Sequence, residues 1–209
     1  MEVLELKPVS GKKVYLYLIK KEDRELFESE YEDLKEIIKN RNFRFAIVDF
    51  NDNDSKELYQ TALLKFLDNF NLPYYNIDIP EYAKNYLYHE VLRHEVQISE
   101  LEAEYENLYL NQQQDTFKAQ NLKSWIDHLK MEVEYKKKNL ELSVKPKWIV
   151  KKVLDIVNEI KNDKLSILQF APEKLFSELK SLFEKYNIKV IRYDINKIDI
   201  KSIVIHERI

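Results

Sequence analysis

The sequence predicts an α/β fold, in which a mostly parallel sheet is flanked by helices and a long antiparallel coiled-coil helical hairpin is inserted mid-chain. Strand and helix patterns alternate along residues 1–80 and again along residues 144–209, an order typical of parallel sheets covered by helices. A continuous heptad pattern fills residues 81–143. We therefore expect a βαβαβ segment, a coiled-coil arm and an αβαββ segment. The arm either crosses between two strands of one sheet or joins two small lobes.

The N-terminal segment contains three strand patterns and two helix patterns. The strand patterns are short runs rich in β-branched and aromatic residues, at 13–20, 43–50 and 74–79. The helix patterns have apolar residues at helical spacing, at 23–40 and 55–70. Pro80 and Glu81 then open the first arm helix, since proline is tolerated in a first turn and an acid there suits the helix dipole.

Fourteen positions with alternating spacings of four and three predict the arm. Paired outward from its turn, the numbers of each pair sum to 227, and each pair joins an a position with a d position, as an antiparallel seam requires. Twelve of the fourteen are apolar, and the exceptions are His94 and Lys136. The seam positions are Leu87, Val91, His94, Ile98, Leu101, Tyr105 and Leu108, with Ala119, Leu122, Ile126, Leu129, Val133, Lys136 and Leu140.

The C-terminal segment repeats the alternation of helices and strands. Pro146 is expected to end the arm, because a proline inside a helix removes a hydrogen bond and clashes with the preceding turn. Helix patterns follow at 147–161 and 173–186, and strand patterns at 165–170, 188–195 and 202–206.

Composition excludes several function classes. The 209 residues carry a net charge of -3, which makes nucleic acid an unlikely partner. The absence of cysteine excludes disulfides and thiolate metal sites, and a single glycine, Gly11, excludes the dinucleotide fingerprint and the P-loop. The longest apolar run, about six residues, is far below the roughly 20 of a membrane-spanning helix. We expect a cytoplasmic protein without a membrane partner, and the sequence assigns no cofactor.

Five apolar residues lie outside the predicted seam, where a free two-helix arm should be polar. They need a further surface, which the protein's own body, a second copy or a foreign protein could supply. The primary functional hypothesis is therefore a protein-interaction or assembly module that acts through the arm. The five residues are Leu92, Val96, Trp125, Met131 and Tyr135.

Three aspartates support the alternative hypothesis of a ligand- or nucleotide-binding sensor or a metal-dependent enzyme. Asp49, Asp78 and Asp194 each stand near the end of a predicted strand, and parallel strands would bring them to the carboxyl edge where open α/β sheets bind ligands. Aspartate also favours strand ends for local reasons, so both explanations stay open. No metal site is predicted on the arm, because His89 and His94 are five residues apart and do not share a helical face.

Overall fold

The structure, a computed structural model, describes residues 6–21, 26–48, 61–193 and 195. The chain divides into two compact units. The α/β unit comprises Met1–Asp78 with Val150–Ile209, and the helical unit comprises Ile79–Ile149. The main elements of the helical unit are α4 (Glu81–Leu110) and α5 (Phe117–Asn139).

The α/β unit contains a five-stranded sheet with the order β3-β2-β4-β1-β5. All four strand pairings are parallel, so the predicted parallel α/β fold is confirmed. The predicted strand at 202–206 lies outside the described residues. The strands are β1 (Lys13–Lys20), β2 (Phe45–Val48), β3 (Tyr74–Asn76), β4 (Lys164–Ala171) and β5 (Ile188–Tyr193).

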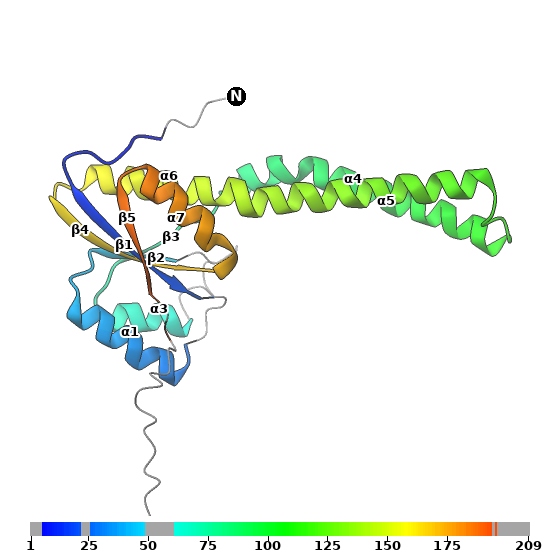
Figure 1. Cartoon of the computed structure of the whole chain (residues 1–209). Helices are drawn as coiled ribbons and strands as arrows, with labels where there is room; N and C mark the ends of the chain where they lie inside the picture. Colours follow the sequence, from blue (N-terminus) through cyan, green and yellow to red (C-terminus); the bar gives the residue numbers. More distant parts are fainter. Residues whose placement is uncertain (1–5, 22–25, 49–60, 194, 196–209) are drawn as a thin grey trace, which may run out of the picture. The chain divides into compact units, whose positions relative to one another are not determined.

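Helices cover both faces of this sheet (Figure 1). The chain steps from β1 to β2 to β3 in one direction and then returns through β4 to β5 in the other. Because parallel crossovers are right-handed, the reversal places the later helices on the opposite face. One face carries α1 (Glu28–Asn40) and α3 (Ala62–Asn69), and the other carries α6 (Lys145–Glu159) and α7 (Phe176–Lys185).

The core under α1 and α3 is a continuous apolar layer. Alternate strand residues such as Ile19, Leu168 and Phe170 meet Leu34 of α1 and Leu67 of α3, and all five are almost completely buried. The intervening strand residues, among them Leu16, Leu18 and Ile47, are buried as well. A strand buried on both faces needs a nearly unbroken apolar sequence, which is what the strand patterns show.

Pro146 does not end the second long helix, contrary to the expectation from sequence. Helix α5 passes into a π-helical segment, η1 (Leu140–Val144), and then into α6 without a non-helical residue. The amide of Lys145 bonds to the carbonyl of Leu140, five residues back. This wider turn, placed immediately before the proline, relieves the clash and the lost hydrogen bond that a proline imposes on a regular α-helix.

Gln169 is a polar residue in the middle of the central strand β4. Its side chain is fully buried, and neither its amide nitrogen nor its amide oxygen has a hydrogen-bond partner in the described part of the chain. In the sheet it lies between Leu18 of β1 and Ile47 of β2. A buried amide without partners destabilises the folded state, typically by about 1–3 kcal/mol.

We expect Gln169→Leu to raise the free energy of unfolding by about 1–2 kcal/mol, because the substitution removes an unpaired amide and keeps most of the side-chain volume. Urea denaturation of the full chain measures the change. As a control, Leu168→Ala on the other face should lower the same quantity by about 2–5 kcal/mol. A loss of stability in Gln169→Leu would contradict the prediction and show that the amide makes a valuable bond.

Candidate functional site

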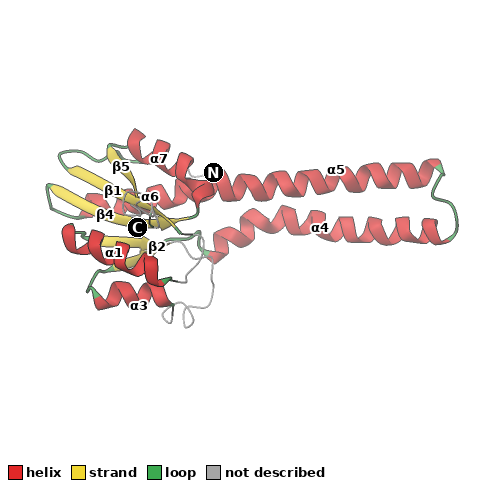
Figure 2. Cartoon of the chain, turned by 60° about the horizontal axis from the view of Figure 1, so that its bottom comes forward, coloured by secondary structure: helices red, strands yellow, loops and turns green. Residues whose placement is uncertain are grey.

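Helices α4 and α5 lie side by side and bury a shared apolar layer (Figure 2). The layer consists of Val91 and Ile98 from α4 with Ile126, Leu129 and Val133 from α5. All fourteen predicted seam positions are buried or half-buried, and none is exposed. Five of the predicted seam positions thus form the shared apolar layer, and the antiparallel coiled coil itself stays a prediction.

Ion pairs border this buried layer on both sides of the helix pair. Glu104 lies 2.6 Å from Lys118 near the turn, and Glu90 lies 2.8 Å from Lys136 far from it. Two further pairs, Glu95 with Lys137 and Glu102 with Lys130, lie between them at 2.7 and 2.6 Å. Lys136, a polar seam residue, thus packs its stem inside while its ammonium reaches the surface carboxylate of Glu90.

His94, the second polar seam residue, has a carboxylate nearby. Its Nδ1 lies 3.5 Å from Glu132 of α5 and has no hydrogen-bond partner in the described residues. His128 approaches the other oxygen of Glu132 at 3.7 Å. The described residues contain no group of three or more histidine, aspartate or glutamate side chains that could hold a metal ion.

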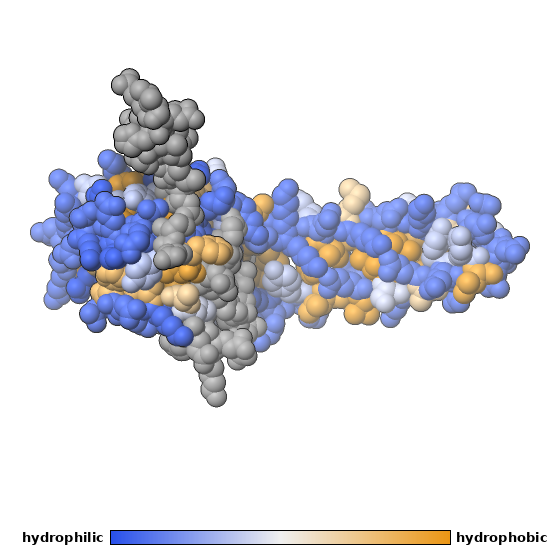
Figure 3. Space-filling model, turned by 90° about the horizontal axis from the view of Figure 1, so that it is seen from below, coloured by the Kyte–Doolittle hydropathy of each residue, from blue (hydrophilic) through white to orange (hydrophobic). Residues whose placement is uncertain are grey.

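The five apolar residues predicted to lie outside the seam are all exposed. Their exposed fractions run from 52% for Trp125 to 73% for Tyr135. Figure 3 shows apolar side chains on the outer surface of the helical unit. Leu92 with Tyr135, and Val96 with Met131, also have numbers that sum to 227. If the seam register holds, the two residues of each pair lie at the same level of the two helices, and the two pairs are one helical turn apart.

Sequence reasoning missed five further exposed aromatic or apolar residues on these helices. Three flank the turn at 111–116, and two lie in the first turns of α4. Near the turn, Glu102 and Glu104 of α4 are paired with lysines of α5. Helical spacing alone marked the seam and could not show which of the other apolar residues stay uncovered. The missed residues are Tyr82, Tyr86, Tyr109, Leu110 and Phe117.

The predicted aspartate site can be placed only in part. Asp78 follows β3 by two residues and is half-buried. Asp49 and Asp194 lie outside the described residues. The proposed meeting of the three carboxylates at the carboxyl edge of the sheet therefore stays a prediction.

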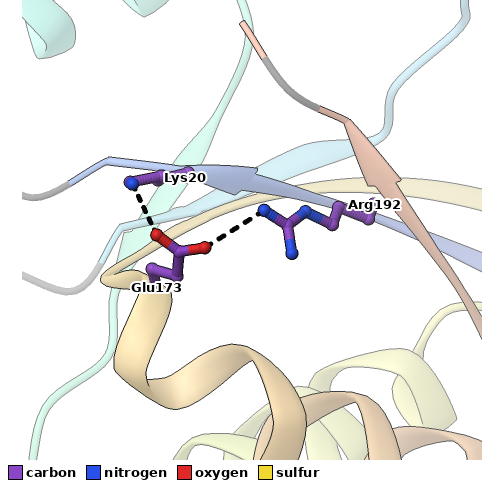
Figure 4. A network of polar contacts seen from close by, with 3 residues as sticks. All are labelled: Lys20, Glu173 and Arg192. Atoms are coloured by element: carbon purple, nitrogen blue, oxygen red, sulfur yellow. Dashed lines mark hydrogen bonds and ion pairs between the residues drawn. The ribbon is translucent and has the colours of Figure 1, made fainter.

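A different cluster of charges occupies the carboxyl edge of β1, β4 and β5 (Figure 4). Glu173, just after β4, receives Lys20 of β1 at 2.5 Å and Arg192 of β5 at 3.2 Å. A hydrogen bond from Lys20, followed by the charge of Lys20, lowers the pKa of Glu173. Strands β1 and β4 are neighbours whose following helices cover opposite faces, which is the point where open α/β sheets bind ligands.

A buried ion pair lies close to this cluster in the sequence. Lys21, the residue after β1, approaches Glu30 of α1 at 2.9 Å, and both side chains are almost fully buried. Glu30 also accepts a hydrogen bond from the backbone amide of Phe27, which caps α1. Sequence reasoning singled out none of the five charged residues at this edge, because their partners come from distant segments.

Comparison with known proteins gives no indication of function, so function has to be inferred from the geometry described above. No protein-family model, no curated protein and no solved structure matches the chain. Within the described residues, no helix is long and apolar enough to cross a membrane.

We expect the contact between α4 and α5 to weaken in acid. The hydrogen bond from Lys136 lowers the pKa of Glu90 below its ordinary value of 4.5. A carboxyl whose pKa is lower in the folded state contributes stability above about pH 4.5, and this contribution is lost as the pH falls through the folded value. Hydrogen exchange of the amides around Glu90 should therefore accelerate between about pH 5 and pH 3, once the intrinsic pH dependence is subtracted.

Two variants test the cause of that acid sensitivity. Glu90→Gln should remove part of the acceleration, while Glu100→Gln should leave it unchanged, because Glu100 forms no ion pair in the described residues. Because Glu90 is exposed, the effect should be small and should shrink in high salt. Equal behaviour of the two variants would contradict the role of the Glu90–Lys136 pair.

Proposed function

We propose that the chain is an assembly module, in which α4 and α5 form an antiparallel coiled-coil arm that binds a second copy of the chain. The observation that carries the proposal is the distribution of exposed apolar groups. Ten of the twelve large apolar side chains that are exposed among the described residues belong to α4 and α5. Exposed apolar groups concentrated on one element are typical of interaction surfaces.

The coiled-coil geometry is supported by three independent features of the helix pair. The fourteen seam positions are withdrawn from solvent, their spacings alternate between four and three, and charged pairs border the layer as they do in coiled coils. In such an arm the seam side chains are buried between the two helices and cannot contact another molecule. The exposed apolar groups are then available for a contact with another molecule.

A second copy is favoured over a foreign protein by the placement of four outer residues. Leu92 and Val96 on α4 are matched in level by Tyr135 and Met131 on α5 if the seam register holds. The arm then presents apolar groups from both helices at two adjacent levels, one helical turn apart. Two arms related by a two-fold axis would bring equivalent groups together, as in most homodimers.

Light scattering after size exclusion tests the assembly. We expect the full chain to be a dimer and a quadruple variant, Leu92→Gln with Val96→Gln, Met131→Gln and Tyr135→Gln, to be a monomer of unchanged helical content. A control with Asn121→Gln and Lys123→Gln, two exposed polar positions on α5, should remain dimeric. A chain with residues 88–139 replaced by a Gly/Ser linker should be a folded monomer.

Two outcomes would contradict self-association. A full chain that is monomeric at high concentration would exclude a stable dimer. A dimer that survives both the quadruple substitution and the linker replacement would place the interface in the α/β unit. In either case the exposed apolar groups of the arm would need a different occupant.

A second candidate function, a ligand-binding sensor at the carboxyl edge, is favoured by the charge cluster at the reversal point of the sheet. Lys20, Glu173 and Arg192 converge there, and an anionic ligand could take the place of the Glu173 carboxylate between the two cations. A screen of Mg²⁺, phosphate and nucleotides by thermal denaturation tests this candidate. Stabilisation that disappears in Arg192→Gln and in Asp78→Asn would support it, and stabilisation by none of these ligands would contradict it.

A further inference from the structure

The apolar layer under α1 ends before the sheet does. On the face that α1 covers, β4 carries the buried residues Phe170 and Leu168, then half-buried Ser166 and exposed Lys164. Strand β1 changes in the same direction, from buried Ile19 to half-buried Tyr15. A central parallel strand is usually apolar throughout, so the polar amino ends of these strands call for an explanation other than packing.

A hollow of about 590 Å³ lies over these polar strand ends, beyond the last residue of α1. Its volume is within the roughly 300–1,000 Å³ of ligand pockets. The lining side chains come from three neighbouring strands, from the last residue of α1 and from the two residues that follow it. They are Tyr15, Tyr17 and Ile191, Lys164 and Ser166, and Asn40, Arg41 and Asn42.

Two cations in this hollow are held in place by tyrosine rings. The guanidinium of Arg41 donates a hydrogen bond to the Tyr17 hydroxyl at 2.7 Å and lies 4.8 Å from the centre of that ring. The ammonium of Lys164 lies 5.8 Å from the centre of the Tyr15 ring. The hydrogen bond to Tyr17 occupies one edge of the Arg41 guanidinium, so further N–H groups remain for a ligand.

A second hollow of about 470 Å³ adjoins the first and shares Asn42, Lys164 and Ser166 with it. Here the exposed ring of Tyr75 packs edge-on against buried Phe45, with ring centres 5.2 Å apart. Three polar side chains with exposed donors also line it, namely Arg44, Asn71 and Asn162. The second hollow thus combines an aromatic surface with amide and guanidinium groups.

The charge of both hollows is positive, although the whole chain is slightly acidic. Among the described residues, no aspartate or glutamate lines either of them. In the described part of the chain, none of the three cations, Arg41, Arg44 and Lys164, forms an ion pair with a carboxylate. Lys12 differs from these three cations, because its ammonium donates hydrogen bonds to the backbone carbonyls of Val157 and Asn158 near the end of α6.

We propose that the first hollow is a binding site for a phosphate monoester of nucleotide size. A phosphate dianion matches the charges of Arg41 and Lys164, and its three terminal oxygens match the guanidinium, ammonium, hydroxyl and amide donors around them better than a carboxylate would. The Tyr75 ring lies on the opposite face of the sheet, because Tyr75 pairs with Ile47, whereas Ser166 lies on the face of Leu168. The second hollow therefore meets this site at the shared residues Asn42, Lys164 and Ser166. The carboxyl end of α1 opposes an anion here, but Arg41 directly follows that end and offsets its partial negative charge.

This site lies at the amino edge of the sheet, within the α/β unit, and does not depend on the proposed assembly through the arm. It also differs from the carboxyl-edge candidate, which uses Lys20 and Arg192. The two ligand sites can therefore be separated by variants at one edge or the other.

Isothermal titration of the full chain with the four nucleoside monophosphates, the matching nucleosides and inorganic phosphate tests the proposal. We expect saturable binding of at least one monophosphate, and weaker binding of its nucleoside and of phosphate alone. Arg41→Gln and Lys164→Gln should each weaken the monophosphate by about 10- to 100-fold, as expected for loss of one charge-assisted hydrogen bond. Lys180→Gln, an exposed cation of α7 outside both hollows, should bind like the unmodified chain.

The variants also separate folding from binding. Arg41→Gln removes a contact with Tyr17 and could disturb the fold, so its melting temperature is compared with that of Lys164→Gln, whose ammonium makes only a ring contact. A short 5′-phosphorylated single-stranded oligonucleotide is titrated beside the free monophosphate. The comparison distinguishes a nucleotide at the end of a nucleic-acid strand from a free nucleotide, and tighter binding of either one supports the site.

Two results would overturn the proposal. The first is the absence of saturable binding by every monophosphate and by the phosphorylated strand. The second is binding that is unchanged in both Arg41→Gln and Lys164→Gln. If that binding is instead lost in Arg192→Gln, the ligand belongs to the carboxyl edge.

Discussion

The α/β unit depends on the parallel pairing of β1 with β4. The eight residues of β1 pair with eight residues of β4, from Lys13 with Lys164 to Lys20 with Ala171, so the centre of the sheet joins segments about 150 residues apart. Strand β2 is connected to β1 only by way of β4, which lies between them, and β3 pairs only with β2. Without β4, the N-terminal strands β1 and β2 would not belong to one sheet. The helices α1 and α3 would also lose the central strand against which they pack. Pairing of such separated segments costs loop-closure entropy and is intrinsically slow to form, so the unit cannot close until nearly the whole chain is present.

The same arrangement explains why charged groups gather at two opposite edges of the sheet. At the carboxyl edge, the reversal of the helix faces between β1 and β4 leaves room for Glu173 to meet Lys20 and Arg192. At the amino edge, the end of α1 leaves Tyr15, Ser166 and Lys164 uncovered. The first edge neutralises its cations with a carboxylate, whereas the second does not. This difference in local charge balance is what separates a structural ion cluster from a candidate anion site.

Sequence reasoning succeeded for features that depend on nearby residues, such as helical or strand periodicity. It failed for features that depend on contacts between segments far apart in the chain. The two long helices α4 and α5, and the withdrawal of their repeated apolar positions from solvent, were predictable, because each helix repeats its apolar spacing every turn or two. The strands of the sheet were predictable as β-branched runs, but their order was not, since a parallel strand carries no local mark of its partner. Pro146 was misread because the rule for prolines assumes a regular α-helix, and the π-turn before it changes the geometry. The two hollows combine residues from five segments of the chain. Their only sequence signal was the change from Leu168 to Ser166 and Lys164 in a central strand. Asp49 and Asp194 lie outside the described residues, so the aspartate hypothesis stays a prediction.

The connection from β3 to β4 leaves the sheet through α4 and returns through α5, so both of its ends belong to one crossover. In a helix pair of this kind, each layer of the seam contacts mainly the layers beside it, as in proteins built from repeats. If α4 and α5 form the proposed coiled coil, matched insertions or deletions of one heptad in each helix would keep the a-to-d pairing and would leave the strands untouched. The two helices could then change in length by whole heptads while the sheet stays constant.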